Sequence, residues 1–350
     1  MMMRLMSVGI LASLLSLAGC SPAQSTSVVK KASGSAAAGG LKVCFISNNA
    51  HEFWKLAEVG VKQAGKDLGV KTEFRMPARG GGDEQRQIIE DLITQGYEHF
   101  AVSPNDPKNQ GSYYDGKIKE GITFITVDND LLPGSKRLCF LGTNNFEAGR
   151  SAGELVKKAV PNGGKVAIFV GKLDNLNAPQ RRNGVIAVLA GLKTMEEAEA
   201  LVAKGYPIKA GSYEILDTLT DNAEIPKCKA NADDTITKHP DIACMVGLWA
   251  YNAPQIMLAA KDQGKLGKIK IISFDEQKET LDGIRSGDIV GTIVQQPYEF
   301  GYQAVKTLTD VARGNKSNLP KDGIGHIGHQ VIEKANVDAF EKKLNELKSK

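Results

Sequence analysis

The 350-residue sequence is short of cysteine, of aromatic residues and of any large excess of one charge. Aromatic residues make up 6% of the chain, and 44 basic residues, spread along it, face 40 acidic ones, so no footprint for binding nucleic acid appears. The five cysteines form no close pair typical of a zinc or redox motif. After residue 20 no segment is apolar enough to span a membrane. We therefore expect a soluble body from about Leu41 onward and no nucleic-acid partner.

Motifs of common enzyme classes are also missing. The sequence has no Gly-x-Ser-x-Gly elbow, no Gly-x-x-x-x-Gly-Lys phosphate loop and no His-Glu-x-x-His zinc helix. The run Gly80-Gly81-Gly82 lacks the Lys-Ser/Thr of a phosphate cradle, which favours a flexible turn. His326 and His329 share a glycine-rich loop, but a metal needs more ligands than this loop offers. The sequence thus predicts no metal, no cofactor, no catalytic residue and no enzyme.

The longest apolar stretch lies in residues 1–19, after a short basic start. It is shorter than the about 20 apolar residues of a membrane-spanning helix, which favours a cleavable signal peptide. Its ending, Leu17-Ala18-Gly19-Cys20, resembles that of bacterial lipoproteins, in which cleavage precedes a lipidated cysteine. We expect Cys20 to be that lipidation site. The alternative is an ordinary secretory signal followed by an incidental cysteine.

Residues 20–40 predict a flexible tether, because they are rich in Ser, Ala and Gly and too poor in apolar residues to build a core. The expected location is therefore outside the cytoplasm, on the periplasmic or cell-surface side, with the protein lipid-anchored to a membrane. In an exported chain a disulfide is an open alternative to buried free thiols. The cysteines concerned are Cys44, Cys139, Cys228 and Cys244.

From residue 41 onward short apolar strands alternate with helical patterns. The first cycle predicts strands over 42–47, 70–75, 100–102, 122–127 and 137–141 and helices over 53–68, 83–95 and 109–119. A second cycle predicts helices over 145–159, 178–190, 225–238, 252–263 and 298–312, strands over 165–170, 213–219, 242–248, 269–274 and 289–294, and a further helix and loop over 193–210. This order is typical of parallel sheets covered by helices on both faces.

The restart of the cycle predicts an α/β fold with two doubly wound parallel-sheet lobes joined by a multi-crossing hinge. The expected N-terminal lobe comprises residues 41–143 plus 296–324, and the expected C-terminal lobe comprises residues 144–295 plus 325–350. A ligand cleft is expected between the lobes, where the carboxyl ends of the strands lie.

Polar and aromatic residues follow the ends of the predicted strands, where open parallel sheets bind ligands. In chain order they are Ser47, Phe53, Trp54, Ser103, Asp128, Asn129, Arg181, Trp249, Asp275 and Gln295. Carboxylates accept paired hydrogen bonds from neighbouring hydroxyls, a guanidinium donates a planar fork, and aromatic rings cover the C–H faces of a pyranose or furanose. The set suits a sugar.

Purely structural roles are open for these candidates as well. The two aspartates can be turn residues or helix caps, and the two serines can cap the next helices. One member of the pair Phe53 and Trp54 can serve only to pack its helix on the sheet. Arg182 is the alternative to Arg181, which can instead pair on the surface.

Five short motifs carry a family resemblance. They are SNNAHEFW (47–54), ITVD (125–128), APQRRNG (178–184), ISFD (272–275) and GTIVQQP (291–297). In this order they resemble motifs of the periplasmic sugar-binding proteins of ABC transporters, in the ribose, galactose and allose group, over essentially all of 41–350. The resemblance implies a type 1 periplasmic binding protein fold, a monomer, and a cleft that closes on a monosaccharide gripped by Asp128, Arg181 and Asp275.

Two positions depart from that family's usual pattern. Asn129 stands where the family usually has Arg, and Trp249-Ala250 stands where the ribose group has Asn-Asp. One guanidinium is lost and an indole is gained, which removes hydrogen-bond donors and adds stacking area. The ligand is therefore open, and a larger, deoxy or methylated sugar is an alternative to ribose.

The expected function is that of a lipid-anchored solute-binding protein that captures a monosaccharide and delivers it to an ABC transporter permease in the inner membrane. A receptor component that senses a sugar or a signal molecule with the same fold is an open alternative. A sugar-processing enzyme would use Asp128 and Asp275 as a glycosidase pair. Sugar-responsive repressors share the two-lobed core, but they begin with a DNA-binding helix-turn-helix rather than an export signal.

Overall fold

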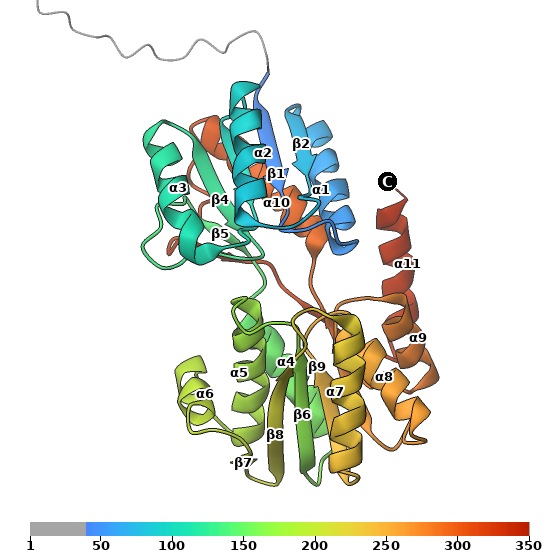
Figure 1. Ribbon diagram of the computed structural model, residues 1–350. Coiled ribbons are helices and arrows are strands. Elements are labelled where there is room, and N and C mark those ends of the chain that lie inside the picture. Colours follow the sequence, from blue (N-terminus) through green and yellow to red (C-terminus); the bar gives the residue numbers. More distant parts are fainter. Residues whose placement is uncertain (1–39, 350) are drawn as a thin grey trace, which may run out of the picture. The chain divides into compact units, whose positions relative to one another are not determined.

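The computed structural model describes residues 40–349, which fall in one compact unit (Figure 1). Cys20, the predicted signal peptide and the predicted tether up to residue 39 lie outside the described residues. Within the described range no helix is long and apolar enough to cross a bilayer. All four apolar clusters of the structure lie inside this unit, so it contains its own cores and can be produced by itself.

The first lobe is built on a six-stranded sheet in the order β12-β5-β4-β3-β1-β2, in which every neighbouring pair is parallel. Its strands are β1 (Lys42–Ile46), β2 (Lys71–Arg75), β3 (His99–Val102), β4 (Thr123–Val127), β5 (Phe140–Gly142) and β12 (Ile324–His326). Its helices are α1 (Phe53–Leu68), α2 (Gly82–Thr94), α3 (Pro107–Lys119) and α10 (Pro297–Ala312).

Strand β1 shows why helices cover both faces of this sheet. Val43 and Phe45 belong to the apolar cluster under α1 and α10, whereas Cys44 and Ile46 belong to the cluster that includes residues of α2 and α3. Successive side chains of a strand point to opposite faces, so a continuous apolar strand needs a cover on each side.

The second lobe is built on a seven-stranded sheet in the order β13-β11-β10-β9-β6-β8-β7. Its strands are β6 (Gly164–Val170), β7 (Ile208–Ala210), β8 (Tyr213–Thr220), β9 (Ile242–Gly247), β10 (Lys270–Phe274), β11 (Gly291–Val294) and β13 (Gln330–Glu333). Its helices are α4 (Asn145–Ala159), α5 (Asn177–Ala190), α6 (Met195–Val202), α7 (Ile225–Lys238), α8 (Asn252–Asp262) and α9 (Lys278–Ser286). Only the edge strands β7 and β13 pair antiparallel among the strands described.

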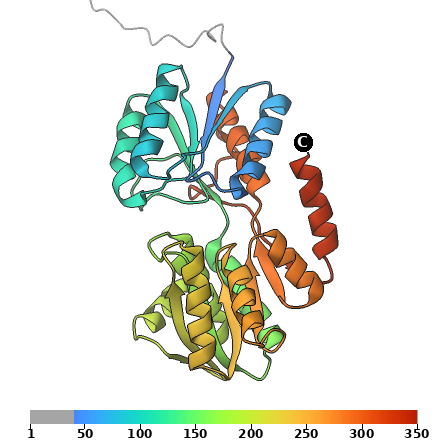
Figure 2. The ribbon, with the colours of Figure 1, turned by 45° about the vertical axis from the view of Figure 1, so that its right-hand side comes forward.

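The chain crosses between the two sheets three times: from β5 to α4, from β11 to α10 and from β12 to β13 (Figure 2). Side chains tie these crossings together, since Gln296 Nε2 donates to Gly328 O at 2.6 Å and Ser151 Oγ lies 2.8 Å from His329 Nε2. The predicted α/β fold with two doubly wound lobes and a multi-crossing hinge is confirmed. The exact residue boundaries assigned to the lobes stay a prediction.

The predicted helices and strands of both cycles are present, with ends shifted by at most three residues. The sequence pattern does not predict β7, α9, β12, β13 and the last described helix, α11 (Val337–Lys348). The strands among them have three or four residues and lie at or next to sheet edges, so they carry too short a periodic signal. The disulfide left open does not form, because Cys44, Cys139, Cys228 and Cys244 are free thiols, all buried.

Candidate functional site

A cavity of about 1250 Å³ lies between the two lobes. Predicted site residues that line it are Phe53, Trp54, Asp128, Asn129, Arg181, Trp249, Asp275 and Gln295. Ser47 and Ser103 are fully buried and lie outside the lining. The structure therefore brings eight of the ten predicted residues to one cleft, because the carboxyl ends of the parallel strands of each sheet lie at a common edge.

Asp128 and Asp275 occupy equivalent positions in the two lobes. Each follows a central strand, β4 or β10, and each has a positive φ, 65° for Asp128 and 63° for Asp275. Their backbone N–H groups donate to the next strand, to Leu141 O at 3.0 Å and to Ile293 O at 2.8 Å. A left-handed backbone is uncommon outside glycine, and such strain persists where the surrounding structure fixes it, often at functional sites. The helix-cap interpretation is wrong, since the helices that follow are capped by Asn144 and Gln277.

Arg181 is buried, with only 2% of it exposed, and its side chain is held in place by several contacts. Its Nε donates to Asn145 Oδ1 and its Nη1 to Leu248 O, both at 2.9 Å, and its guanidinium carbon lies 4.6 Å from the centre of the Phe274 ring. Its Nη2 is buried and has no hydrogen-bond partner among the described residues. A buried donor without a partner implies a missing acceptor, so Arg181 is a pre-positioned donor aimed into the cleft.

Arg182, the alternative to Arg181, is not part of the lining. Its Nε donates to Asn183 Oδ1 at 3.0 Å. Helices α4 and α5 approach each other closely at Arg181. A Cβ on Gly149 would lie 2.1 Å from Arg181 O, so only glycine permits this crossing.

The charges in the cleft influence one another. Burial raises the pKa of Asp128 to about 6, although the Arg181 guanidinium opposes this rise, and the Asp275 carboxylate adds to it. Burial lowers the pKa of Arg181, while Asp275 and Asp128 act in the opposite direction. One cation thus interacts electrostatically with two carboxylates that come from different lobes.

On the second lobe, Gln295 and Glu276 flank Asp275. Gln295 Nε2 donates to Asp275 Oδ1 at 3.0 Å, and Gln295 Oε1 is buried without a partner in the described part of the chain. Glu276 Oε2 is also buried and unpaired there. Burial and the neighbouring Asp275 raise the pKa of Glu276. The second lobe therefore offers an unused acceptor on Gln295 in the same cleft as the unused donor of Arg181.

The two predicted serines act behind the lining rather than in it. Ser103 Oγ donates to Asp128 Oδ2 at 3.4 Å, and Ser47 Oγ donates to Asn49 O at 2.7 Å. The helix-cap alternative is wrong for them too, because the N-caps of α1 and α3 are Glu52 and Asp106.

Sequence reasoning missed Gln85, which joins the ends of two strands. Its Nε2 donates to Ser47 O at 2.8 Å and to Ser103 O at 2.7 Å, and the residue is fully buried. It thereby fixes the loops after β1 and β3, next to Asp128. Nothing in the sequence distinguishes this glutamine from a solvent-exposed helical one.

The two tryptophans differ in their surroundings. Trp54 is 2% exposed, donates from Nε1 to Asn48 Oδ1 at 2.9 Å and packs edge-on against Phe53, so it mainly packs α1. Trp249 is half-buried and donates from Nε1 to Asn177 Oδ1 at 3.2 Å. A Cβ on Gly171 would lie 1.9 Å from its ring, so glycine is required beneath the indole. The structure fixes Trp249 as a flat apolar wall of the cleft.

Asn129 lies beside Asp128 and is 7% exposed. Other lining residues were not singled out from the sequence: Asn48, Asn49, His51, Asn175, Asn177 and Tyr251. Asn175 and Asn177 lie in the segment after β6, so the strand-end rule that identified the others would have found them.

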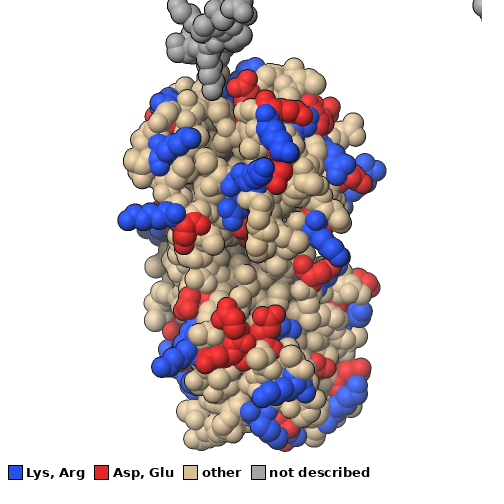
Figure 3. Space-filling view, turned by 90° about the vertical axis from the view of Figure 1, so that its left-hand side faces the viewer, with Lys and Arg blue, Asp and Glu red and all other residues tan. Residues whose placement is uncertain are grey.

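The outer surface shows no basic stripe on the face drawn in Figure 3. Basic and acidic side chains occur on both lobes there, and acidic ones gather on the second lobe (Figure 3). Helix α6 exposes Glu196, Glu197 and Glu199. Among residues 40–349 no three His, Cys, Asp or Glu side chains are placed to hold a metal ion.

Comparisons with known proteins agree with this geometry. The family model described as "Periplasmic binding protein domain" matches residues 43–316. The D-allose-binding periplasmic protein of Escherichia coli (strain K12) is 24% identical over 275 residues, which are 76% of this chain and 83% of that protein. The ribose import binding protein of Bacillus subtilis (strain 168) is 23% identical over 282 residues, 79% of this chain and 82% of that protein.

Among solved structures, an ABC transporter solute binding protein from Burkholderia graminis C4D1M, in complex with D-arabinose, is similar over 86% of this chain and 97% of that chain. The two chains are 28% identical and superpose with a TM-score of 0.74. A sugar-binding protein of a sugar ABC transporter from Bacillus halodurans superposes with a TM-score of 0.73 at 23% identity, over 86% of this chain and 99% of that chain.

Proposed function

Because the chain belongs to the periplasmic binding protein family, we propose that it is an extracytoplasmic solute-binding protein that captures a monosaccharide by lobe closure and delivers it to an ABC transporter permease. One observation carries the proposal: a single cleft collects a buried unpaired donor on Arg181, a buried unpaired acceptor on Gln295 and a carboxylate from each lobe. Related proteins named for binding allose or ribose support the sugar.

The chemistry of the cleft fits hydroxyl groups. A sugar hydroxyl donates its hydrogen to Asp128 or Asp275 and accepts one from Arg181 Nη2. Gln295 Oε1 accepts from another hydroxyl, and the indole of Trp249 covers the C–H face of the ring. Arg181 Nη2 and Gln295 Oε1 then both obtain a partner, without a covalent step.

Closure follows from this distribution of contacts. Asp128 belongs to the first lobe, while Arg181, Asp275 and Gln295 belong to the second. A sugar that bonds to both lobes binds the closed arrangement more tightly than the open one and shifts the population toward it. The relatives are named as binding proteins, which supports binding without catalysis by the two aspartates.

The lipid anchor completes the proposal. Lipidation at Cys20 and a tether up to residue 40 would hold a monomeric binding domain at the surface of a membrane. The support for this part is the sequence alone, since Cys20 lies outside the described residues.

A thermal-shift screen of residues 40–350 against pentoses, hexoses, deoxy sugars and polyols tests the proposal. A ligand that binds only the folded state raises the unfolding midpoint by mass action, so one class of sugar should produce a saturable increase. Asp275→Ala is the control and should abolish that increase. A flat result across all compounds with a well-folded sample would contradict sugar capture and favour a non-sugar solute.

A further inference from the structure

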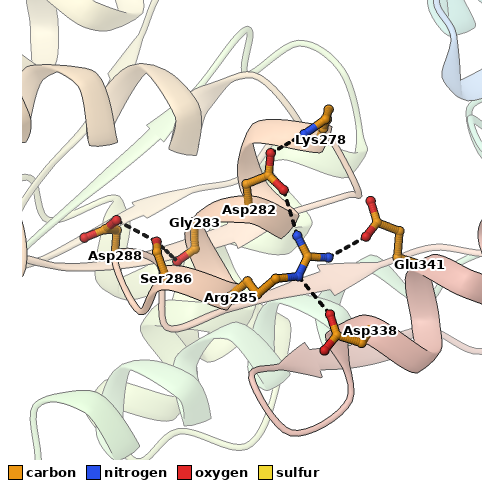
Figure 4. Close-up of polar contacts among 8 residues, drawn as sticks. All are labelled: Lys278, Asp282, Gly283, Arg285, Ser286, Asp288, Asp338 and Glu341. Carbon is orange, nitrogen blue, oxygen red and sulfur yellow. Dashed lines mark hydrogen bonds and ion pairs between the residues drawn. The ribbon is translucent and has the colours of Figure 1, made fainter.

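Helix α11 begins firmly attached to the second lobe. Arg285 of α9 donates from Nε to Asp338 Oδ1 at 2.8 Å and from Nη2 to Glu341 Oε2, and it also bonds to Asp282 of its own helix at 2.7 Å (Figure 4). Val337, at the start of α11, is 1% exposed and belongs to an apolar cluster of the second lobe. The first turns of α11 are thus fixed by an ion-pair network and by burial.

The other end of α11 reaches the first lobe. Helices α11 and α1 are in contact. In Figures 1 and 2, α11 starts next to α9 and runs alongside the first lobe. Leu344 of α11 is 6% exposed and Leu56 of α1 is 4% exposed, and both belong to the same apolar cluster. The next residue of α1, Ala57, belongs to the core of the first lobe instead. Leu56 is therefore the residue of α1 that packs outside its own lobe.

The last turn of α11 also borders the cleft. Lys348 lines the same cavity as Leu56 and Glu276. Its charge opposes the rise in the pKa of Glu276 that burial and Asp275 cause. The end of α11 thus contributes both apolar contact and positive charge at one edge of the cleft.

In Figures 1 and 2, α11 runs to one side of the crossing segments, so it connects the lobes in addition to them. Hinge rotation that brings Asp128 toward Asp275 must move α1 relative to α9, and α11 is attached to both. The cleft, at about 1250 Å³, is larger than the roughly 300–1,000 Å³ of pockets that enclose small ligands. In this structure the contact of α11 with α1 therefore accompanies a cleft that has not closed around a small ligand.

We propose that α11 is a strap that holds the cleft open: Arg285 anchors it to the second lobe, and its Leu344 shares one apolar cluster with Leu56 of the first lobe. A contact made in only one of two conformations shifts their populations by its own free energy. The effect of the strap on ligand affinity rests on the proposed function, whereas its effect on the separation of the lobes does not.

The test compares residues 40–350 with four variants by small-angle X-ray scattering in the absence of sugar. Leu56→Ala removes the contact on the first lobe, Arg285→Ala loosens the anchor, and a chain that stops after Asn336 lacks the strap. Lys343→Ala, at an exposed position of α11, is the matched control. Circular dichroism confirms folding, and Leu56→Ala decides the question if the shortened chain does not fold.

We expect Leu56→Ala and the shortened chain to shift the distance distribution toward more compact lobes, Arg285→Ala to do so less, and Lys343→Ala to match the parent. A sugar found by thermal shift should then bind Leu56→Ala about three- to tenfold more tightly, because less free energy opposes closure. Unchanged or more extended scattering would overturn the strap. If no sugar binds the parent protein, the proposed function fails, while the scattering still decides the strap.

Discussion

The two lobes place an aspartate in the same backbone setting but surround it differently. Asp128 and Asp275 both follow a central strand with positive φ and donate their N–H to the neighbouring strand. Around Asp128 the first lobe adds Ser103 behind the carboxylate and Asn129 beside it. Around Asp275 the second lobe adds the fixed guanidinium of Arg181, the Gln295 amide with its unpaired acceptor, and the indole of Trp249.

This difference indicates an order of events. The second lobe holds most of the pre-positioned donors and acceptors, so a sugar should bind there first and Asp128 should complete the site on closure. Under the proposed function, the left-handed aspartate would belong to the first binding surface in the second lobe and to the closing contact in the first lobe. Substitutions in the two lobes should therefore have unequal effects.

The largest effect is expected in the second lobe. Asp275→Ala removes hydrogen bonds to sugar hydroxyls and leaves Gln295 Nε2 without its acceptor. We expect affinity to fall by about 100-fold or more, since each hydrogen bond to a charged group contributes roughly 1.5–3 kcal/mol. Titration calorimetry measures this loss, and the thermal midpoint without sugar should fall modestly, because Gln295 Nε2 is left buried without an acceptor. Affinity within twofold of the parent would remove Asp275 from the site.

Asp128→Asn should weaken binding less and stabilise the fold. The amide keeps the shape of the side chain but loses the charge-assisted bond, so we expect an affinity loss of about tenfold. Burial raises the pKa of Asp128 from 3.8 to about 6, so the folded state disfavours its charged form. Removing that charge should raise stability at pH 7 by on the order of 3 kcal/mol. Urea unfolding measures the gain, and a destabilised variant would contradict the burial argument.

The lining of this cleft could be predicted because it follows from strand ends. Asp128 and Asp275 come after apolar strands, and parallel pairing brings such ends together whatever the intervening sequence. The environment of Arg181 could not be predicted, because its partner Asn145 lies on α4 and meets it only where glycine lets the two helices cross. Sequence periodicity shows that Arg181 lies near the start of a helix, not which way its side chain faces.

Helix α11 was missed for a different reason. Its apolar residues Val337, Phe340, Leu344 and Leu347 are spaced three and four apart, so the signal of an amphipathic helix is present. The pattern of α1 likewise shows Leu56 as apolar. Neither pattern tells which lobe an apolar side chain contacts, because that depends on the path of the chain through the hinge.

The pH dependence of binding should sharpen the contrast between the lobes. Since the pKa of Asp128 is raised to about 6, this carboxyl takes up a proton as the pH falls through 6 and no longer accepts two hydrogen bonds. We expect sugar affinity to decrease several-fold between pH 7 and pH 5. The fold responds in the opposite direction: the proton held by Asp128 stabilises it below pH 3.8, and this contribution is lost as the pH rises through 6.

Asp128→Asn provides the control for that profile. It cannot titrate, so its affinity should vary less with pH than that of the parent. Affinities of both proteins measured at pH 5, 6 and 7 decide the point. If the affinity of the parent does not change with pH, or if Asp128→Asn changes with pH as the parent does, protonation of Asp128 does not control binding.

The smallest effect concerns the two tryptophans, one in each lobe. Both tryptophans line the cleft, but Trp249 is half-buried over Gly171, whereas Trp54 is 2% exposed and bonded to Asn48. Trp249→Phe keeps part of the apolar wall, so we expect affinity to fall only about two- to fivefold by loss of stacking area. The change in fluorescence on adding sugar should disappear in Trp249→Phe and persist in Trp54→Phe. If both variants keep it equally, the indole of Trp249 does not contact the ligand, and the second lobe recognises the sugar by its polar groups alone.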